Sequence, residues 1–256
     1  MAKTIVYLSL DSETMGFNYP VKLEDGTYVA GCNHYPLVQV AGTILSEDLE
    51  EQVSFDYMVQ PTAEEMARSD EGTVQFHIEN GFDVEWETRE RLPLHEVEDR
   101  IIFILTSYFT ANHREFLVDG KLPAYDAKAK YVIIVHGKSV NFDKSFINAQ
   151  MPRLGLILGH QVADTSSTRT MMYPSKILPN RLSRTQSTHF ALDDVGAAVA
   201  DQRALVEFME IIPKHLGGKK FDTLEEITEY VSKNGLSYIP PKSEVGDVSQ
   251  NTKYEQ

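Results

Sequence analysis

The chain of 256 residues has a single cysteine, Cys32, and no apolar stretch near the length of a membrane span. One cysteine cannot form an internal disulfide, which is typical of a reducing compartment, so we expect a cytoplasmic location. A bilayer-spanning helix needs about 20 apolar residues in succession, so we expect no membrane contact. The N-terminal sequence MAKTIVYLSLDS reaches an aspartate too soon for a secretory signal, and we expect none.

Positive charge is also scarce. The chain carries 24 lysines and arginines against 38 aspartates and glutamates, which gives a formal net charge of −14. Phosphate contacts dominate the affinity of proteins for long nucleic acids, and such proteins usually present basic surfaces. No tract rich in lysine and arginine occurs here. We therefore expect any nucleic acid that the protein handles to touch few phosphates, or to be met through metal ions.

The apolar residues, 42% of the chain, are arranged as strands first and then as alternating helices and strands. Strands are expected at 5–10, 37–45, 53–60 and 131–136, with a hairpin turn at Asp25-Gly26. Helices are expected at 94–108, 144–151, 190–212 and 224–232, with short helices between 62 and 80 and a polar tail from Pro240. We expect Pro152 and Pro213 to stop the helices before them. This order predicts an α/β fold, a mixed sheet flanked by helices.

The first strand ends in two carboxylates one residue apart, in the sequence YLSLDSETMGF. Alternate residues of a strand face the same side, so Asp11 and Glu13 stand next to each other. Like charges held that close repel each other unless a proton or a cation lies between them. The pair indicates a divalent metal site, although the same spacing also occurs in ordinary loops.

Two later segments present further acidic residues. In VIIVHGKSVNFDKSF, Asp143 opens a helix after a buried strand, and in THFALDDVGAAVADQ, His189 lies five residues before Asp194. Each has a structural alternative, since Asp143 would also cap a helix and Asp193 and Asp194 would also be first-turn charges. The combination of the three segments predicts one chemical set that faces a common cleft.

These segments resemble the three motifs of the DEDDh 3′–5′ exonucleases, a family that includes proofreading exonuclease subunits, ribonuclease T and oligoribonuclease. DSETMGF resembles the first motif, HGKSVNFDKSF the second and HFALDDVGAAVAD the third. The resemblance covers roughly residues 3–209. It implies a ribonuclease H-like mixed five-stranded sheet flanked by helices, in an exonuclease domain of residues 1–212. Residues 213–256 would form a C-terminal helical extension and a polar tail.

The resemblance also implies hydrolysis with two metal ions. Two Mg²⁺ or Mn²⁺ ions, which prefer oxygen ligands, would be held by Asp11, Glu13, Asp143 and Asp194. His189 would be the general base on the attacking water, and the product would be a 5′-mononucleotide.

Further residues would contact the substrate by the same resemblance; they are Thr14, Met15, Gly16, Phe17, His77, Ser139 and His160. Phe17 is similar to an apolar wedge that stacks on a terminal base, with ordinary core as the alternative. His77, in FHIENGF, would contact a phosphate, and Ser139 matches a serine of the second motif. The family's Tyr-Arg pair, which caps the 5′ phosphate of a dinucleotide, falls on His160 and Gln161. Without the arginine, a strict preference for dinucleotides is not expected.

The resulting hypothesis is an oligoribonuclease-like homodimer that degrades short single-stranded RNA with a free 3′ end. One alternative is a DNA-directed exonuclease of the proofreading type, with the same chemistry on another polymer. A second is a non-catalytic binding module with the exonuclease fold, and a third is an acidic metal-buffering protein, which leaves His189 unexplained. The segments 18–36, 111–130 and 213–256 exceed the compact form of the family, and the sequence assigns them no role.

Overall fold

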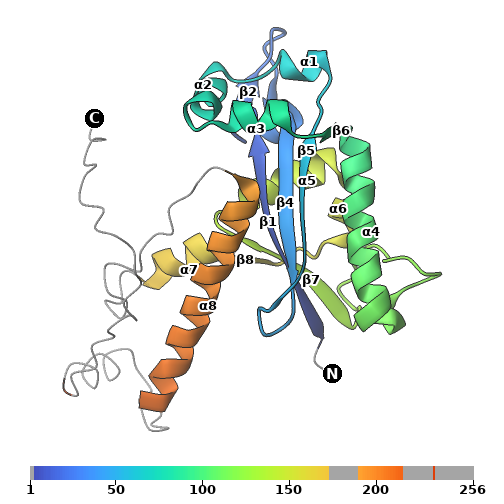
Figure 1. Cartoon of the computed structure of the whole chain (residues 1–256), viewed down its shortest axis with the longest axis vertical. Helices are drawn as coiled ribbons and strands as arrows, with labels where there is room; N and C mark the ends of the chain where they lie inside the picture. Colours follow the sequence, from blue (N-terminus) through green and yellow to red (C-terminus); the bar gives the residue numbers. More distant parts are fainter. Residues whose placement is uncertain (1–2, 173–189, 216–232, 234–256) are drawn as a thin grey trace.

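A mixed β-sheet forms the centre of the molecule in a computed structural model that describes residues 3–172, 190–215 and 233. In these residues the sheet has six strands in the order β6-β5-β4-β1-β7-β8 (Figure 1). The strands are β1 (Thr4–Thr14), β4 (Leu37–Leu45), β5 (Glu51–Val59), β6 (Arg91–Leu92), β7 (Tyr131–Gly137) and β8 (Val162–Asp164). The predicted α/β fold with a mixed sheet is confirmed, with six strands in place of the expected five.

Strand β1 lies at the middle of the sheet and is longer than the sequence indicates. It pairs antiparallel with β4 over its whole second half, where Asp11 lies opposite Ala41 and Glu13 opposite Gln39. Its parallel pairing with β7 ends at Ser9. Asp11 and Glu13 are therefore part of β1, and the last residues of β1 extend beyond the end of β7.

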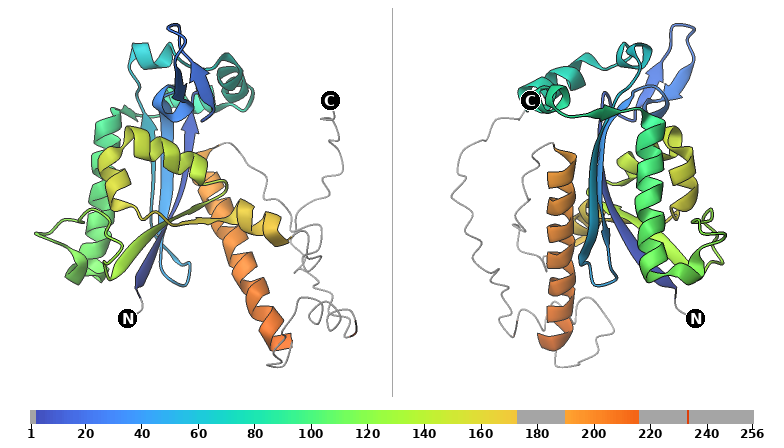
Figure 2. Two further views of the ribbon diagram at one scale, coloured as in Figure 1. Left: turned by 180° about the vertical axis from the view of Figure 1, so that it is seen from behind. Right: turned by 45° about the vertical axis from the view of Figure 1, so that its right-hand side comes forward.

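Helices cover both faces of this sheet, with α4, α5 and α6 on one side and α8 on the other (Figure 2). The helices are α1 (Ala63–Met66), α2 (Glu71–Glu79), α3 (Phe82–Thr88), α4 (Leu94–Asn112), α5 (Asn141–Gln150), α6 (Pro152–Ile157), α7 (Thr165–Met172) and α8 (Ala191–His215), with 3₁₀ turns at Gly31–Asn33 and Arg114–Phe116. Pro152 stops α5 as expected and also begins α6, where its missing N–H costs nothing. Helix α8 continues through Pro213 and ends at His215, three residues beyond the expected end at 212.

Because side chains alternate along the strands, apolar residues pack on both faces of the sheet. Leu8 and Leu10 of β1 belong to the main core together with Ile101 of α4. On the other face, Ala41 of β4 packs against Val195 near the start of α8. The small residues there let α8 approach the sheet closely, so that its first turn lies over β1 and β4.

A separate group of elements lies at the carboxyl end of β1. It contains α1, α2, α3 and a hairpin formed by β2 (Pro20–Lys22) and β3 (Tyr28–Ala30) (Figure 1). The predicted turn at Asp25-Gly26 is confirmed, and Gly26 has the positive φ of 84° that a turn of this kind requires. This group stands next to the acidic end of β1.

The helix expected at 224–232 and the tail from Pro240 lie outside the described residues, so the division into 1–212 and 213–256 stays a prediction. In the part of the chain that the structure describes, no helix combines the length and the apolar character needed to cross a bilayer.

Candidate active site

Carboxylates from two elements meet over the end of β1. Asp11 and Glu13 face α8, and Asp194 lies in the first turn of that helix. Carboxylate oxygens of these three residues lie within 4.8 Å of one another. Strand alternation places the first two side by side, and the close packing of α8 on β1 supplies the third. The three motifs predict this convergence, although Asp194 follows Glu13 by 181 positions in the chain.

The fourth predicted ligand, Asp143, lies beside this group in the first turn of α5. Its Oδ1 accepts hydrogen bonds from the backbone N–H of Ser12 (2.9 Å) and from the Ser12 hydroxyl (2.7 Å). The Ser12 amide is available because β7 has already ended, so no strand pairs with it on that side. Asp143 is buried and near enough to act electrostatically on both Asp11 and Glu13.

Burial and mutual repulsion destabilise the charged forms of these acids. Burial, followed by the charges of Asp143, Glu13 and Asp194, raises the pKa of Asp11 well above its usual range. Burial and the neighbouring carboxylates raise the pKa of Glu13 to about 8. Burial also raises the pKa of Asp143 to about 7, against the lowering effect of the Ser12 hydrogen bonds. A concentration of acidic oxygens of this kind fits a divalent cation, which supplies the missing positive charge.

A cation of the chain itself also lies at this site, and the sequence argument did not single it out. Lys138 follows β7, and its Nζ lies 3.6 Å from Oδ2 of Asp201, two turns after Asp194 on α8. Its charge lowers the pKa of Asp11, opposing the other influences on that group. The signal in the sequence was a lysine directly after a buried strand and inside the second motif.

A buried hydrogen-bond network lies behind the carboxylates, and the three motifs do not reveal it. Gln39, fully buried and directly opposite Glu13, accepts a hydrogen bond from the N–H of Ala191, the first residue of α8 (3.3 Å). Its amide donates to Asp56 (2.8 Å), which in turn accepts from Arg89 (2.8 Å). This network ties the start of α8 to the sheet. An amide side chain inside the apolar strand LVQVAGTIL was its signal.

The predicted general base, His189, lies outside the described residues, so its role stays a prediction. Its neighbour Phe190 is half-buried and packs with Met15 and Met58. The carbonyl of Phe190 accepts the N–H of Asp194 (3.0 Å), which fixes the first turn of α8.

The predicted substrate residues of the first motif have different environments. Thr14 and Met15 are buried, and the Thr14 hydroxyl donates to the carbonyl of Gly16 (2.7 Å). Gly16 lies under the ring of Tyr35, where a Cβ would stand 2.4 Å from a ring carbon. Phe17 is 58% exposed, so the alternative that it belongs to the core is wrong.

His77 is buried, and its ring lies 4.6 Å from that of Phe82. Its Nε2 is hydrogen-bonded to the carbonyl of Thr14 (2.9 Å). The observed role is therefore to attach α2 to the first motif, and a contact with a phosphate stays a prediction.

Ser139 has the left-handed φ of 53°, and its N–H donates to Oδ1 of Asp164 (3.0 Å). The same oxygen accepts the N–H groups of Ser166 and Ser167 (2.9 and 3.3 Å). Asp164 thus holds the turn that carries Lys138 and Ser139. A contact between Ser139 and substrate stays a prediction.

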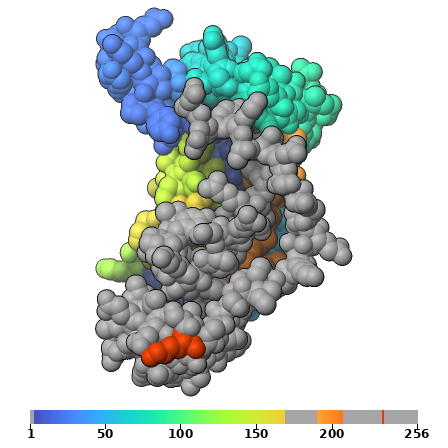
Figure 3. Space-filling model, turned by 90° about the vertical axis from the view of Figure 1, so that its left-hand side faces the viewer, coloured from blue at the N-terminus to red at the C-terminus, as the bar shows by residue number. Residues whose placement is uncertain are grey.

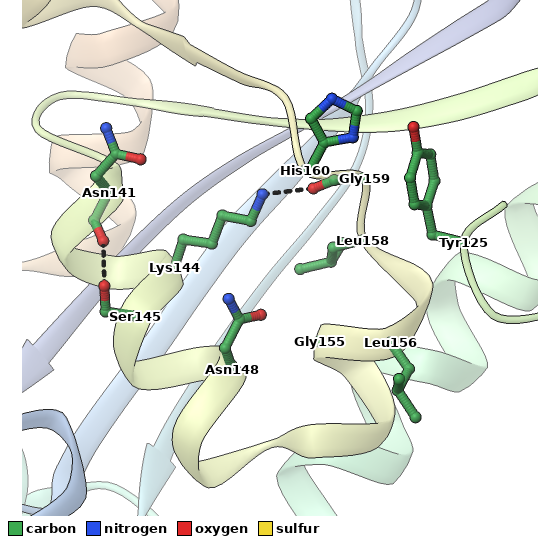
Figure 4. A pocket seen from close by; sticks show the side chains of 10 residues that line it. All are labelled: Tyr125, Asn141, Lys144, Ser145, Asn148, Gly155, Leu156, Leu158, Gly159 and His160. Atoms are coloured by element: carbon green, nitrogen blue, oxygen red, sulfur yellow. Dashed lines mark hydrogen bonds between the residues drawn. The ribbon is translucent and has the colours of Figure 1, made fainter. Parts of the chain in front are cut away.

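His160 lies in a pocket of about 530 Å³, with its ring 5.5 Å from that of Tyr125 (Figure 4). Lys144 of α5 reaches across the pocket and donates to the carbonyl of Gly159. The α5 residues of the pocket lie on a different face of the helix from Asp143. The structure does not bring His160 to the carboxylates, and its contact with substrate stays a prediction.

Comparison with known proteins agrees with the motifs. The chain is 29% identical over 142 residues to the oligoribonuclease of Corynebacterium diphtheriae, a match that covers 54% of this chain and 58% of that protein. The match thus spans less than two thirds of the relative. No protein-family model matches the chain.

Solved structures that are similar to this one include exonuclease I in its apo form, which is 13% identical and has a TM-score of 0.49 over 84% of this chain and 45% of that one. Another is exonuclease I from Methylocaldum szegediense, 14% identical, with a TM-score of 0.49 over 81% of this chain and 42% of that one. The oligoribonuclease relative confirms the resemblance to the exonucleases near oligoribonuclease over the part of the chain that the match covers.

Proposed function

We propose that the protein is a metal-dependent 3′–5′ exonuclease that degrades short single-stranded RNA to 5′-mononucleotides. The observation that carries the proposal is the convergence of Asp11, Glu13 and Asp194 within 4.8 Å, with Asp143 beside them. These are the acidic residues of the three motifs, in the order that the resemblance requires. The oligoribonuclease relative supports the same activity.

The four carboxylates would hold two divalent ions, Mg²⁺ or Mn²⁺, and Asp143 would contribute Oδ2 because Ser12 occupies its Oδ1. Such ions, when bound, stabilise the charge that develops on the scissile phosphate and lower the pKa of the attacking water. His189, two positions before the first residue of α8 in the sequence, would accept the proton of that water on an imidazole nitrogen. The oxygen of that water would form a bond to phosphorus as the bond from phosphorus to the 3′ oxygen of the shortened strand breaks, and that 3′ oxygen would take a proton from solvent water.

Other residues would position the reacting groups. Gln39 would keep the first turn of α8, and with it Asp194, at a fixed place above β1. The ammonium group of Lys138 would attract the substrate phosphate toward Asp11. The exposed ring of Phe17 would stack on the terminal base, an interaction that tolerates any base.

The net charge of −14 supports short strands, because a long backbone would meet many acidic side chains. His160 and Gln161 replace a capping pair of the family, which supports substrates longer than a dinucleotide. The resemblance also supports a homodimer and an exonuclease domain of residues 1–212. Cys32, which is buried and unpaired, supports a cytoplasmic location.

The decisive experiment is digestion of 5′-labelled RNAs of two to twenty-five nucleotides, and of matched DNAs, with Mg²⁺ or Mn²⁺. We expect a ladder that shortens from the 3′ end, faster for shorter RNAs and absent with EDTA. Asp194→Asn should reduce the rate by about 100-fold or more, because it removes a charged metal ligand. Asp193→Asn, an exposed neighbour in the same turn, is the matched control and should remain active.

Two results would contradict the proposal. If Asp194→Asn digests RNA as fast as the wild type, the chain is a binding module and the activity comes from elsewhere. If DNA is digested faster than RNA of the same length, the proofreading type of exonuclease is the correct assignment.

A further inference from the structure

Three aromatic rings are exposed next to the first motif, which is unusual for side chains of this kind. Phe17 is 58% exposed, Tyr19 73% and Tyr28 65%. The rings of Phe17 and Tyr19 lie 5.9 Å apart between centroids, with their planes inclined by 31°, so they form one surface. Contiguous exposed rings commonly mark a binding surface, because they present a large apolar area at low entropic cost.

Tyr28 lies on the hairpin of β2 and β3, directly opposite Lys22 in the register of the two strands. Residues opposite each other in an antiparallel pair share a face, so this face of the hairpin presents a ring beside an ammonium group. Both side chains are exposed. Proteins that bind single strands combine these two groups, the ring for a base and the cation for a phosphate.

The hairpin is fixed to the end of the first motif. The Cys32 N–H donates to Oδ1 of Asn18 (2.9 Å), which joins the two ends of the hairpin segment. Gly31 approaches the Phe17 carbonyl so closely that a Cβ would stand 1.8 Å from its oxygen. Figure 3 shows the hairpin as a projection beside the layer of α1, α2 and α3. The backbone that carries the rings is therefore held in place before any ligand binds.

We propose that Tyr19 and Tyr28 extend the stacking surface that begins at Phe17, so that the hairpin holds the bases that precede the terminal nucleotide of a single strand. The inference rests on the proposed function, which places the terminal base at Phe17. The position of Phe17 supports a single strand as the ligand, because Phe17 follows Glu13 by four residues and so joins the ring surface to the carboxylates at the end of β1. Charge supports it too: a protein with a net charge of −14 gains little from a phosphate backbone, whereas stacking does not depend on charge.

The surface would make affinity depend on the length of the strand. A dinucleotide has one base before its terminal nucleotide and would meet Tyr19 at most, whereas a longer strand would gain a stacking contact at each further ring. Removal of both tyrosines should therefore weaken the binding of a long strand more than that of a dinucleotide.

The test compares the double variant Tyr19→Ala/Tyr28→Ala with the wild type, using fluorescein-labelled oligoadenylates of two and twelve nucleotides. Binding is measured by fluorescence anisotropy with Ca²⁺ in place of Mg²⁺, and turnover is measured separately with Mg²⁺. We expect the twelve-mer to bind at least about 5-fold more weakly for each ring lost, and the dinucleotide to lose less affinity than the twelve-mer. Phe103→Ala is the matched control, because Phe103 is a 72% exposed ring on α4.

A second ligand and a second variant separate stacking from other causes. A twelve-mer that lacks the bases preceding its terminal nucleotide should bind the wild type and the double variant equally. Tyr19→Trp/Tyr28→Trp, which keeps two rings, should bind the complete twelve-mer as tightly as the wild type or more tightly.

The outcomes distinguish the inference from the proposed function. If the wild type digests RNA and the double variant binds the twelve-mer like Phe103→Ala, the inference is wrong and the proposed function stands. If the wild type binds the twelve-mer through these rings but digests nothing, the proposed function fails and the surface stands. If the double variant changes only the oligomeric state in sedimentation, the rings cover a second copy of the chain and the inference is overturned.

Discussion

At the scale of single residues, Lys138 would change substrate binding and metal binding in opposite directions. Its ammonium group would attract the substrate phosphate, yet it would also repel a divalent cation held by Asp11. Lys138→Gln should therefore raise KM by about tenfold while lowering the Mn²⁺ concentration needed for half-maximal rate. Both quantities come from initial rates on a labelled RNA five-mer.

Lys138→Arg keeps the charge and should resemble the wild type in both quantities. If Lys138→Gln leaves KM unchanged, or needs more Mn²⁺, Lys138 acts only through its ion pair with Asp201. The outcome is informative because a purely structural role would change the free energy of unfolding without opposite changes in substrate and metal affinity.

Some residues of the site could be predicted from the sequence more readily than others. Asp11 and Glu13 carried a local signal, since strand alternation alone places them together. Gln39 and Lys138 carried none of comparable strength, because their importance depends on which residue of a distant segment lies opposite. Gln39 matters through the N–H of Ala191, which is 152 positions away, and only the packing of α8 reveals that contact.

At the scale of elements, the start of α8 depends on the amide of Gln39. Gln39→Leu would leave the Ala191 N–H and one oxygen of Asp56 without this partner inside the protein. Loss of such a buried partner costs about 1–3 kcal/mol in the free energy of unfolding. The variant should also lose kcat, because Asp194 moves with the helix. Urea unfolding and single-turnover rates measure the two effects.

Thr43→Val is the matched control for this prediction. Thr43 is buried on the same face of β4, and its hydroxyl is hydrogen-bonded to Ser54 (2.9 Å), away from the carboxylates. It should lose stability but keep kcat. Equal losses of kcat in the two variants would show that general destabilisation, rather than the position of α8, explains the result.

The elements that the sequence predicted are those that are long and regular. Strand β4 occupies Leu37–Leu45 as expected, and α4 begins at the expected Leu94. Strands β6 and β8 escaped prediction because two or three residues carry no periodic pattern, and their strand conformation depends on pairing with β5 and β7. Helix α8 continues through Pro213, although proline is unfavourable inside a helix.

At the scale of the whole molecule, the acidic cluster couples folding to pH and to metal. The pKa of Glu13 is raised from 4.5 to about 8 and that of Asp143 from 3.8 to about 7, mainly by burial. A raised pKa means that the folded protein holds these protons more tightly than the unfolded chain does. The stabilisation is fully present below about pH 4 and is lost as the pH rises through 7 and 8.

The metal-free protein should therefore unfold at a lower temperature at pH 8.5 than at pH 5.5, by at least about 4 °C. Mn²⁺ added at pH 8.5 should restore the loss, because it binds the ionised carboxylates of the folded state alone. Thermal unfolding in EDTA and in MnCl₂ measures both effects. Glu13→Gln, which cannot ionise, should flatten the pH dependence, whereas the exposed Glu87→Gln on α3 should not. Equal melting temperatures at the two pH values in EDTA, with no response to Mn²⁺, would show that the carboxylates do not share one buried site. The metal ligands proposed here would then have to be assigned elsewhere.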